Sequence, residues 1–172
     1  MRLMGVMRYQ GIVFRAHDPR WGWSPVSGEG ARIHGGRFNR KGLAALYTSV
    51  TPVTAMREAG LCGLRPQPTL LCAYEVDAEP VLDARDPAQR AALGVTALDV
   101  SCPDWEQRML EGRVPASQRL ADRLIAAGYV GMLVRSFAAG SGADDLNLVL
   151  WRWADRRPSR VALIDDEARL TR

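Results

Sequence analysis

Apolar residues along the chain fall into short alternating runs and a few longer periodic ones. Short runs typical of strands cover residues 11–15, 43–48, 69–76, 81–82, 129–134, 147–153 and 161–164. Longer spacing predicts helices at 52–61, 87–93, 105–111 and 116–127. Because strands and helices do not alternate regularly, we expect a single α+β domain over residues 1–172. Its sheet should be largely antiparallel, continuous or split, with flanking helices.

Two of the predicted helices have clear boundaries. In the helix at 116–127, Leu120 and Leu124 lie on one apolar face with Ala127, and Gly128 follows as a stop. The helix at 52–61 starts after a good N-cap, Thr51, with proline at its first position, and Gly63 is its expected terminator. Glu58 would then project from this helix.

Residues 18–36 have the composition of a long loop, rich in Gly, Pro, Ser and Trp. A loop of this length inside a compact domain is often functional. Trp21 and Trp23 could line a ligand pocket or pin the loop to the core, and we favour the second interpretation.

Composition indicates a globular protein of one domain, with 172 residues, 47% hydrophobic and 24% charged. No apolar run approaches the length of a membrane span, and the N-terminus lacks the features of a signal peptide, so we expect a cytoplasmic protein. Cys62, Cys72 and Cys102 are scattered without metal-ligand spacing, and His17 and His34 are the only histidines. We therefore expect no metal site and interpret the cysteines as small apolar residues.

The net charge of +4 is unevenly distributed, with +7 in residues 1–65 and −3 in residues 66–172. A basic N-terminal half would attract a phosphorylated ligand. A solvated basic surface would explain the uneven charge distribution equally well. Lys41 is the only lysine, so a general preference for arginine also contributes.

Residues 35–58 bring together three side chains of complementary chemistry. Arg37 follows a glycine pair, Tyr47 lies in a predicted strand and Glu58 in the predicted helix, all within 22 positions. A cation, an aromatic face and a carboxylate suit a ligand with phosphates, a flat cationic ring and a sugar. The spacing also fits an ordinary strand–helix unit with Tyr47 in the core and Glu58 in water.

Several short motifs resemble the RES-domain family, the toxins of RES–Xre toxin–antitoxin pairs. They are Val13–Arg15 (VFR), Gly35–Asn39 (GGRFN), Ala45–Tyr47 (ALY), Ala55–Glu58 (AMRE), Leu133–Ser136 (LVRS) and Asn147–Leu150 (NLVL). The resemblance covers about residues 8–153. It implies a fold like that of ADP-ribosyltransferase toxins and NAD as the substrate. The family's Arg, Glu and Ser match Arg37, Glu58 and Ser136.

Cleavage of NAD at its nicotinamide–ribose bond gives the ribose oxocarbenium character, as in glycoside hydrolysis. We expect Arg15 and Arg37 to hold phosphate or ribose oxygens, because the guanidinium fork donates paired hydrogen bonds. Tyr47 would stack on nicotinamide, and Glu58 would stabilise the cationic ribose.

Ser136 and Asn147 complete the expected site. Ser136 would donate a hydrogen bond to the ligand or position Glu58, and Asn147 would support the residues that touch the ligand. Ordinary structural roles remain open for each candidate. No residue decides whether water, inorganic phosphate or a protein side chain accepts the ADP-ribose.

The resemblance also implies a partner, an Xre-like antitoxin. We expect one of its segments to cover the pocket near Arg37, Tyr47 and Glu58, with an acidic group that imitates an NAD phosphate. A host protein that receives ADP-ribose is a second expected partner, and no direct contact with nucleic acid or membrane is expected.

The alternative is a non-enzymatic, basic nucleic-acid-binding module, suggested by the pI near 9.3 and the five tryptophans. No predicted helix carries a basic stripe, and no recognised nucleic-acid-binding motif is present. Rossmann and P-loop enzymes are excluded because no glycine motif stands between a strand and a helix.

Overall fold

The structure, a computed structural model, describes residues 6–61 and 67–170. The strands are β1 (Val6–His17), β2 (Leu46–Ser49), β3 (Leu70–Asp83), β4 (Gly131–Arg135), β5 (Leu146–Leu150) and β6 (Ser159–Leu163). The helices are a 3₁₀ turn (Pro19–Trp21), α1 (Glu29–His34), α2 (Pro52–Glu58), α3 (Pro87–Ala92), α4 (Ala97–Ser101), α5 (Trp105–Leu110) and α6 (Ala116–Ala127). None of the helices in these two segments is long and apolar enough to cross a membrane.

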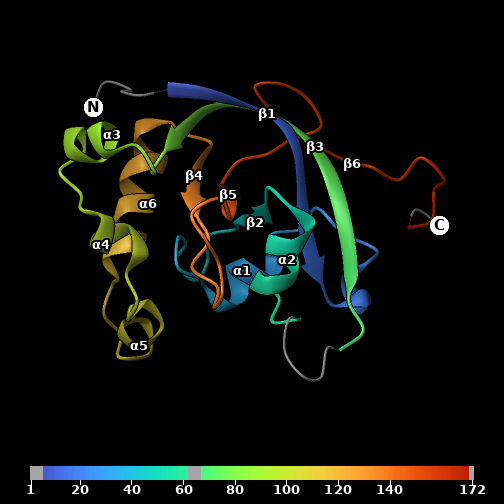
Figure 1. The fold of residues 1–172 in the computed structure, drawn as a ribbon, viewed down its shortest axis with the longest axis horizontal. Coiled ribbons are helices and arrows are strands. Elements are labelled where there is room, and N and C mark those ends of the chain that lie inside the picture. The colour runs from blue at the N-terminus through green and yellow to red at the C-terminus, as the bar shows by residue number, and fades with distance from the viewer. Residues whose placement is uncertain (1–5, 62–66, 171–172) are drawn as a thin grey trace.

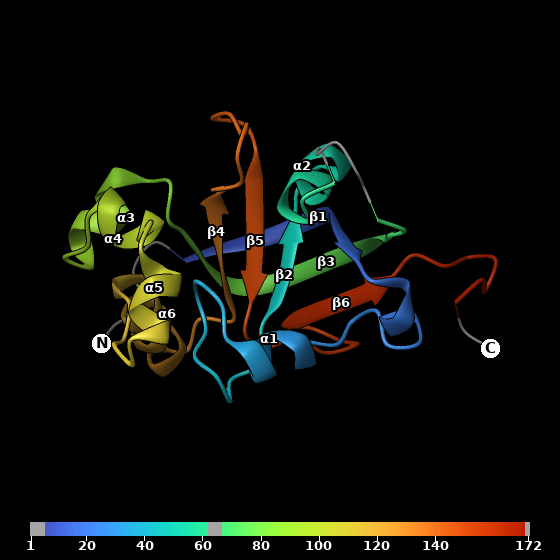
Figure 2. The ribbon, with the colours of Figure 1, turned by 90° about the horizontal axis from the view of Figure 1, so that it is seen from below.

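The strands form one continuous sheet in the order β1-β2-β5-β4-β3-β6. β1 also pairs with β3, so the first five strands of this order close into a barrel-like ring with β6 added on β3. Among the strand pairs of residues 6–61 and 67–170, only β3–β4 is parallel. Helices α3 to α6 gather on one side of the sheet, while α1 and α2 lie near opposite ends of β2 (Figures 1 and 2). The expected α+β fold with a largely antiparallel sheet is confirmed, and the sheet closes instead of splitting.

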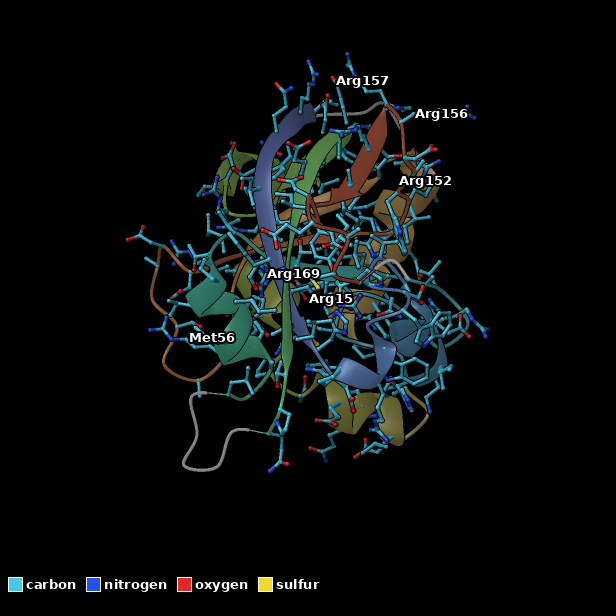
Figure 3. The ribbon with its side chains drawn as sticks, turned by 90° about the vertical axis from the view of Figure 1, so that its right-hand side faces the viewer. Arg15, Met56, Arg152, Arg156, Arg157 and Arg169 are labelled. Carbon is cyan, nitrogen blue, oxygen red and sulfur yellow. The ribbon has the colours of Figure 1, made fainter. Side chains whose placement is uncertain are left out.

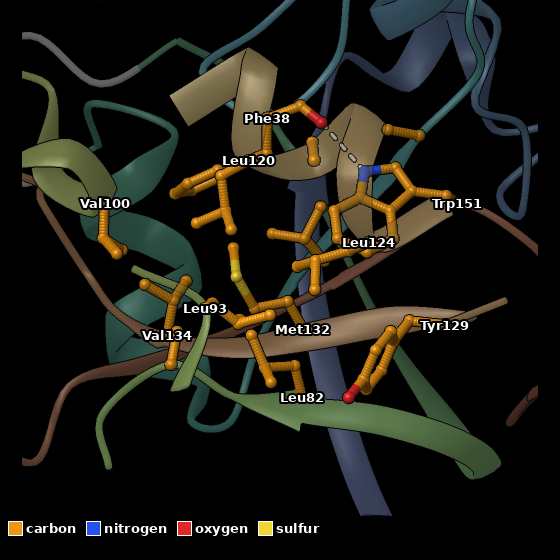
Figure 4. Close-up of a cluster of buried hydrophobic side chains, with 14 residues drawn as sticks. Phe38, Leu82, Leu93, Val100, Leu120, Leu124, Tyr129, Met132, Val134 and Trp151 are labelled. Atoms are coloured by element: carbon orange, nitrogen blue, oxygen red, sulfur yellow. Dashed lines mark hydrogen bonds between the residues drawn. The ribbon is translucent and has the colours of Figure 1, made fainter. Parts of the chain in front are cut away.

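Two hydrophobic clusters lie on the two sides of the central strands. The first packs α6 against β4 and β5 and includes Leu120, Leu124, Met132, Val134 and Trp151 (Figure 4). The second lies inside the ring of strands and includes Val13, Leu46, Tyr74, Leu133 and Leu148. Strands buried on both faces read as continuous apolar runs, which explains the strong strand signals at 129–134 and 147–153.

Strand β3 is longer than the sequence predicts, because it joins the runs at 69–76 and 81–82 into one strand. Glu79 and Pro80 between them indicate a break locally. The neighbouring strand β1 pairs along nearly the whole length of β3, from Leu70 to Leu82. This tertiary pairing also extends β1 well beyond the predicted residues 11–15.

Two short α-helices in the described residues were not predicted. α1 lies inside the supposed loop at 18–36, with Gly28 before it and Gly30 within it. α4 follows Thr96, whose side chain forms a capping box with Asp99. Helices this short gain their stability mainly from tertiary packing, so local sequence signals are weak.

The predicted helix at 116–127 is confirmed, with Leu120 and Leu124 buried and Gly128 in the left-handed conformation at its end. The start of α2 is also confirmed, since the Thr51 side chain accepts a hydrogen bond from the Thr54 N–H. The predicted end at Leu61 is wrong. Gly60, with φ of +71°, terminates the helix in a Schellman-type turn, whereas Gly63 lies outside the described residues. Glu58 is therefore the last residue of α2.

The remaining predictions differ mainly at their ends. The strand predicted at 43–48 is β2 at Leu46–Ser49, and that at 147–153 is β5, which ends at Leu150. Cys72 and Cys102 are free and buried, as expected of small apolar residues, and Cys62 lies outside the described residues.

Candidate active site

A cavity of about 560 Å³ opens where β2 and β5 meet α1, α2 and α5. Five of the six candidate residues line it together: Arg15, Arg37, Tyr47, Glu58 and Asn147. Ser136 is not among the residues that line this cavity. Its charged lining consists of three arginines, at positions 15, 37 and 57, and one glutamate, so the cavity is suited to a ligand with negative charge.

The carboxylate of Glu58 is held by two hydrogen bonds to the same oxygen. Ser136 Oγ donates to Glu58 Oε1 over 2.5 Å, and Asn147 Nδ2 donates to it over 2.5 Å. Within residues 6–61 and 67–170, no side chain or backbone N–H donates to Oε2. One carboxylate oxygen is thus fixed by two donors of the protein.

Each anchor of Glu58 is itself positioned by a serine. Ser49 Oγ donates to Asn147 Oδ1 over 2.7 Å, which fixes the amide with its Nδ2 toward Glu58. Ser141 Oγ lies 2.9 Å from Ser136 Oγ. Because the single proton of Ser136 is donated to Glu58, Ser141 must be the donor in that second bond. Ser136 thus contacts Glu58 as the second of its expected roles requires.

The register of the sheet explains why Ser136 and Asn147 meet Glu58. Asn147 in β5 pairs with Ser49 of β2 on one side and Val134 of β4 on the other. Ser136 follows the end of β4, two residues beyond Val134. Glu58 is the last residue of α2, the helix that follows β2, and lies within hydrogen-bond distance of both side chains.

Arg37 lies close to two aromatic rings. Its guanidinium carbon lies 4.6 Å from the ring centre of Phe137 and 5.8 Å from that of Trp105. Nη1 donates to the carbonyl oxygens of Ser101 and Cys102 at the end of α4. Burial lowers the pKa of Arg37, while the nearby charge of Glu58 raises it. The side chain is therefore fixed before any ligand binds.

The glycine pair before Arg37 allows the turn to approach Tyr47 closely. A Cβ on Gly36 would lie 2.6 Å from the Tyr47 hydroxyl oxygen and 2.7 Å from Asn39 Oδ1. Tyr47 donates its hydroxyl proton to Asn39 Oδ1 over 2.8 Å and accepts a hydrogen bond from the Phe38 N–H. Burial raises the pKa of Tyr47 well above that of a free tyrosine. Its hydroxyl is a structural group, and its ring is the part that lines the cavity.

Every carbonyl of the turn at 36–39 accepts a hydrogen bond from a side chain outside it. Gln118 Nε2 donates to Gly36 and Asn39, Ser117 Oγ donates to Arg37, and Trp151 Nε1 donates to Phe38. All three donor residues come from the N-terminal end of α6 or from the position directly after β5. The motif is thus a rigid turn that carries Arg37 on a scaffold made by the helices.

Arg15 supports the loop that follows β1. Its Nη1 donates to the carbonyl oxygens of Pro25 and Ser27 over 3.2 and 2.8 Å. Burial lowers its pKa from the ordinary arginine value. These two bonds use one of the three guanidinium nitrogens, and Arg15 also lines the cavity.

Asp145 ties the loop after β4 to α2. Its carboxylate accepts hydrogen bonds from Thr54 Oγ1, Arg57 Nη1 and the Gly142 N–H over 2.5, 2.6 and 2.7 Å. These bonds lower the pKa of Asp145. The loop that carries Ser136 is therefore fastened to the helix that carries Glu58.

Sequence reasoning missed several of these residues. Trp105, Phe137, Arg57 and Asp145 had no assigned role, since nothing in their local sequence marks them as neighbours of Arg37 or Glu58. Phe137 follows Ser136 directly, and Arg57 precedes Glu58, so adjacency to a candidate was the available signal. Trp21 and Trp23 were expected to pin their loop, but they are 56% and 75% exposed.

A sequence model of the RES domain matches residues 12–172. The chain belongs to the RES-domain family. No curated protein sequence matches it. A chain of the crystal structure of the M. tuberculosis MbcT–MbcA toxin–antitoxin complex has the same fold, with a TM-score of 0.66 at 22% identity. The match covers 94% of this chain and 85% of that chain.

Proposed function

We propose that this RES domain is the toxin of a cytoplasmic toxin–antitoxin pair and cleaves NAD at the nicotinamide–ribose bond. The observation that carries the proposal is the anchored carboxylate of Glu58, with one oxygen bonded to Ser136 and Asn147. It stands in a cavity that also holds Arg37 and the ring of Tyr47.

Each group of the substrate has a matching group in the cavity. Arg15 and Arg37 bind the pyrophosphate or ribose oxygens, and Tyr47 offers its ring face to the nicotinamide. Oε2 of Glu58 accepts a hydrogen bond from a ribose hydroxyl and faces the carbon that becomes positive. The pre-formed bonds to Oε1 reduce the reorganisation needed when that charge develops.

The reaction breaks the bond between C1′ of the ribose and N1 of nicotinamide. The electron pair leaves with N1, so that nicotinamide departs as a neutral molecule and C1′ becomes oxocarbenium-like. A lone pair of the acceptor then forms the new bond to C1′, and the proton of a water acceptor passes to solvent. Water, inorganic phosphate and a side chain of a host protein are the three acceptors.

Glu58→Ala tests the assignment directly. We expect purified enzyme to consume NAD and the variant to lose about two to three orders of magnitude in rate, with its fold retained. Mass spectrometry of the products, with and without phosphate and host lysate, identifies the acceptor. Turnover by Glu58→Ala at the unmodified rate would place the chemistry elsewhere.

An enzyme that consumes NAD, or ADP-ribosylates an essential protein, harms its own cell and requires an inhibitor. We propose an Xre-like antitoxin, one segment of which covers the cavity and places an acidic group near Arg37. NAD and ADP-ribose should then weaken antitoxin binding. Equal antitoxin affinity with and without these ligands would indicate inhibition at a distant surface.

The basic residues near the C-terminus give little support to the nucleic-acid-binding alternative. Arg152, Arg156 and Arg157 project at one end of the molecule, away from Arg15 (Figure 3). Arg152 donates to the Gly128 carbonyl, and Arg157 lies 3.7 Å from Asp77. The acidic partner of Arg157 makes its charge less available to phosphates. Salt-dependent retention on DNA by Glu58→Ala would be the evidence for that alternative.

A further inference from the structure

A second cavity, of about 380 Å³, adjoins the candidate active site and has no role in the function above. Arg15 and Gly30 line both cavities, so they form a shared wall. Its other lining residues come from β1, the loop after it and α1: His17, Trp21, Trp23, Ser24, Ser27, Glu29, Ile33 and His34. It is thus an aromatic and apolar space beside a basic one.

The loop that bears the two tryptophans is held firmly at its base. Three consecutive carbonyls, those of Pro25, Val26 and Ser27, accept hydrogen bonds from side chains of the barrel. The donors are Arg15 and Tyr74 to Pro25, Trp153 to Val26, and Arg15 again to Ser27. The indoles of Trp21 and Trp23 nonetheless remain largely exposed, with ring centres 6.4 Å apart and planes tilted by 44°. Two exposed indoles on an anchored loop at a cavity are suited to binding a flat ring.

We propose that this cavity binds the adenine ring of NAD, an assignment that rests on the NAD-cleaving function above. The substrate lies across Arg15, with nicotinamide and its ribose near Tyr47 and Glu58. Glu58 then faces the nicotinamide ribose, Arg15 the phosphates, and the two tryptophans the adenine. The protein groups therefore follow the same order as the parts of NAD. Ser24 and His34 are the polar lining side chains suited to bond the ring edge, because both ring nitrogens of His17 already face protein partners, the Asp18 carbonyl and Cys72 Sγ.

Binding measurements with ligands that contain no cleavable nicotinamide bond separate this inference from the catalytic one. ADP-ribose carries adenine and both phosphates, whereas inorganic pyrophosphate carries no base. We expect Trp23→Ala to weaken ADP-ribose by about 5- to 150-fold, the range for stacking of a base on an aromatic side chain. Pyrophosphate affinity should change less than about twofold, and the KM for NAD should rise in parallel with the ADP-ribose Kd.

Leu110→Ala is the matched control, because Leu110 is 77% exposed on α5 and does not line the cavity. It should leave both affinities unchanged. Equal weakening of ADP-ribose and pyrophosphate by Trp23→Ala, or unchanged ADP-ribose binding, would overturn the proposal. Weaker ADP-ribose binding with an unchanged KM for NAD would also overturn it, since the base would then belong to a separate nucleotide. If ADP-ribose binding depends on Trp23 but NAD is not consumed, the catalytic proposal alone fails.

Discussion

Removal of the Ser136 hydroxyl should reduce catalysis through Glu58 and not through a contact with the substrate. Ser136→Ala deletes one of the two hydrogen bonds to Glu58 Oε1. A hydrogen bond to a charged group contributes about 1.5–3 kcal/mol, which corresponds to about 10- to 150-fold in kcat/KM. The loss should stay below that of Glu58→Ala, because Asn147 still holds the carboxylate.

A double-mutant cycle makes this reasoning specific. In a Glu58→Ala background the serine has no carboxylate to position, so adding Ser136→Ala should cost less than about threefold. Initial rates of nicotinamide release at several NAD concentrations give kcat and KM for all four proteins. The effect of Ser136→Ala should fall mainly on kcat, because Ser136 does not line the cavity.

Two variants control for structural damage. Ser159→Ala removes a half-buried serine hydroxyl from β6 that does not line the cavity, and it should leave the rate unchanged. Ser141→Ala removes only the donor to Ser136 and should have a smaller effect than Ser136→Ala. The reasoning is refuted if Ser136→Ala keeps full activity, or if it costs the same factor with and without Glu58 while urea unfolding shows an intact fold.

Three further substitutions test the scaffold around Glu58. Arg37→Lys should lower kcat/KM for NAD by about tenfold, because lysine lacks the planar fork; unchanged kinetics would place Arg37 outside the site. Gly36→Ala should destabilise the protein by about 1–3 kcal/mol in urea unfolding, because its Cβ would meet the Tyr47 hydroxyl at 2.6 Å. An unchanged urea midpoint would show that the turn at 36–39 can shift to accommodate the methyl group. Trp151→Phe leaves the Phe38 carbonyl without its buried indole donor and should cost about 1–3 kcal/mol, a loss that full stability would contradict.

Local sequence was sufficient for the elements whose ends and faces are specified by neighbouring residues. The apolar face of α6 and the cap at Thr51 were read correctly because helix period and capping act over a few residues. The proximity of Arg37, Tyr47 and Glu58 could be proposed for a similar reason: a turn, a strand and a helix follow one another directly. Resemblance to RES domains then added Ser136, which no local pattern marks.

Tertiary structure decided how the carboxylate is held and where the cavity extends. Ser136 and Asn147 lie 78 and 89 positions from Glu58, and only the pairing of β5 with both β2 and β4 brings them to it. Tyr47 shows the same limit, because strand pattern could not tell whether its hydroxyl faces a ligand or, as here, Asn39. Such contacts depend on strand register and loop anchoring, which arise from the packing of the whole chain and leave no local periodicity to read.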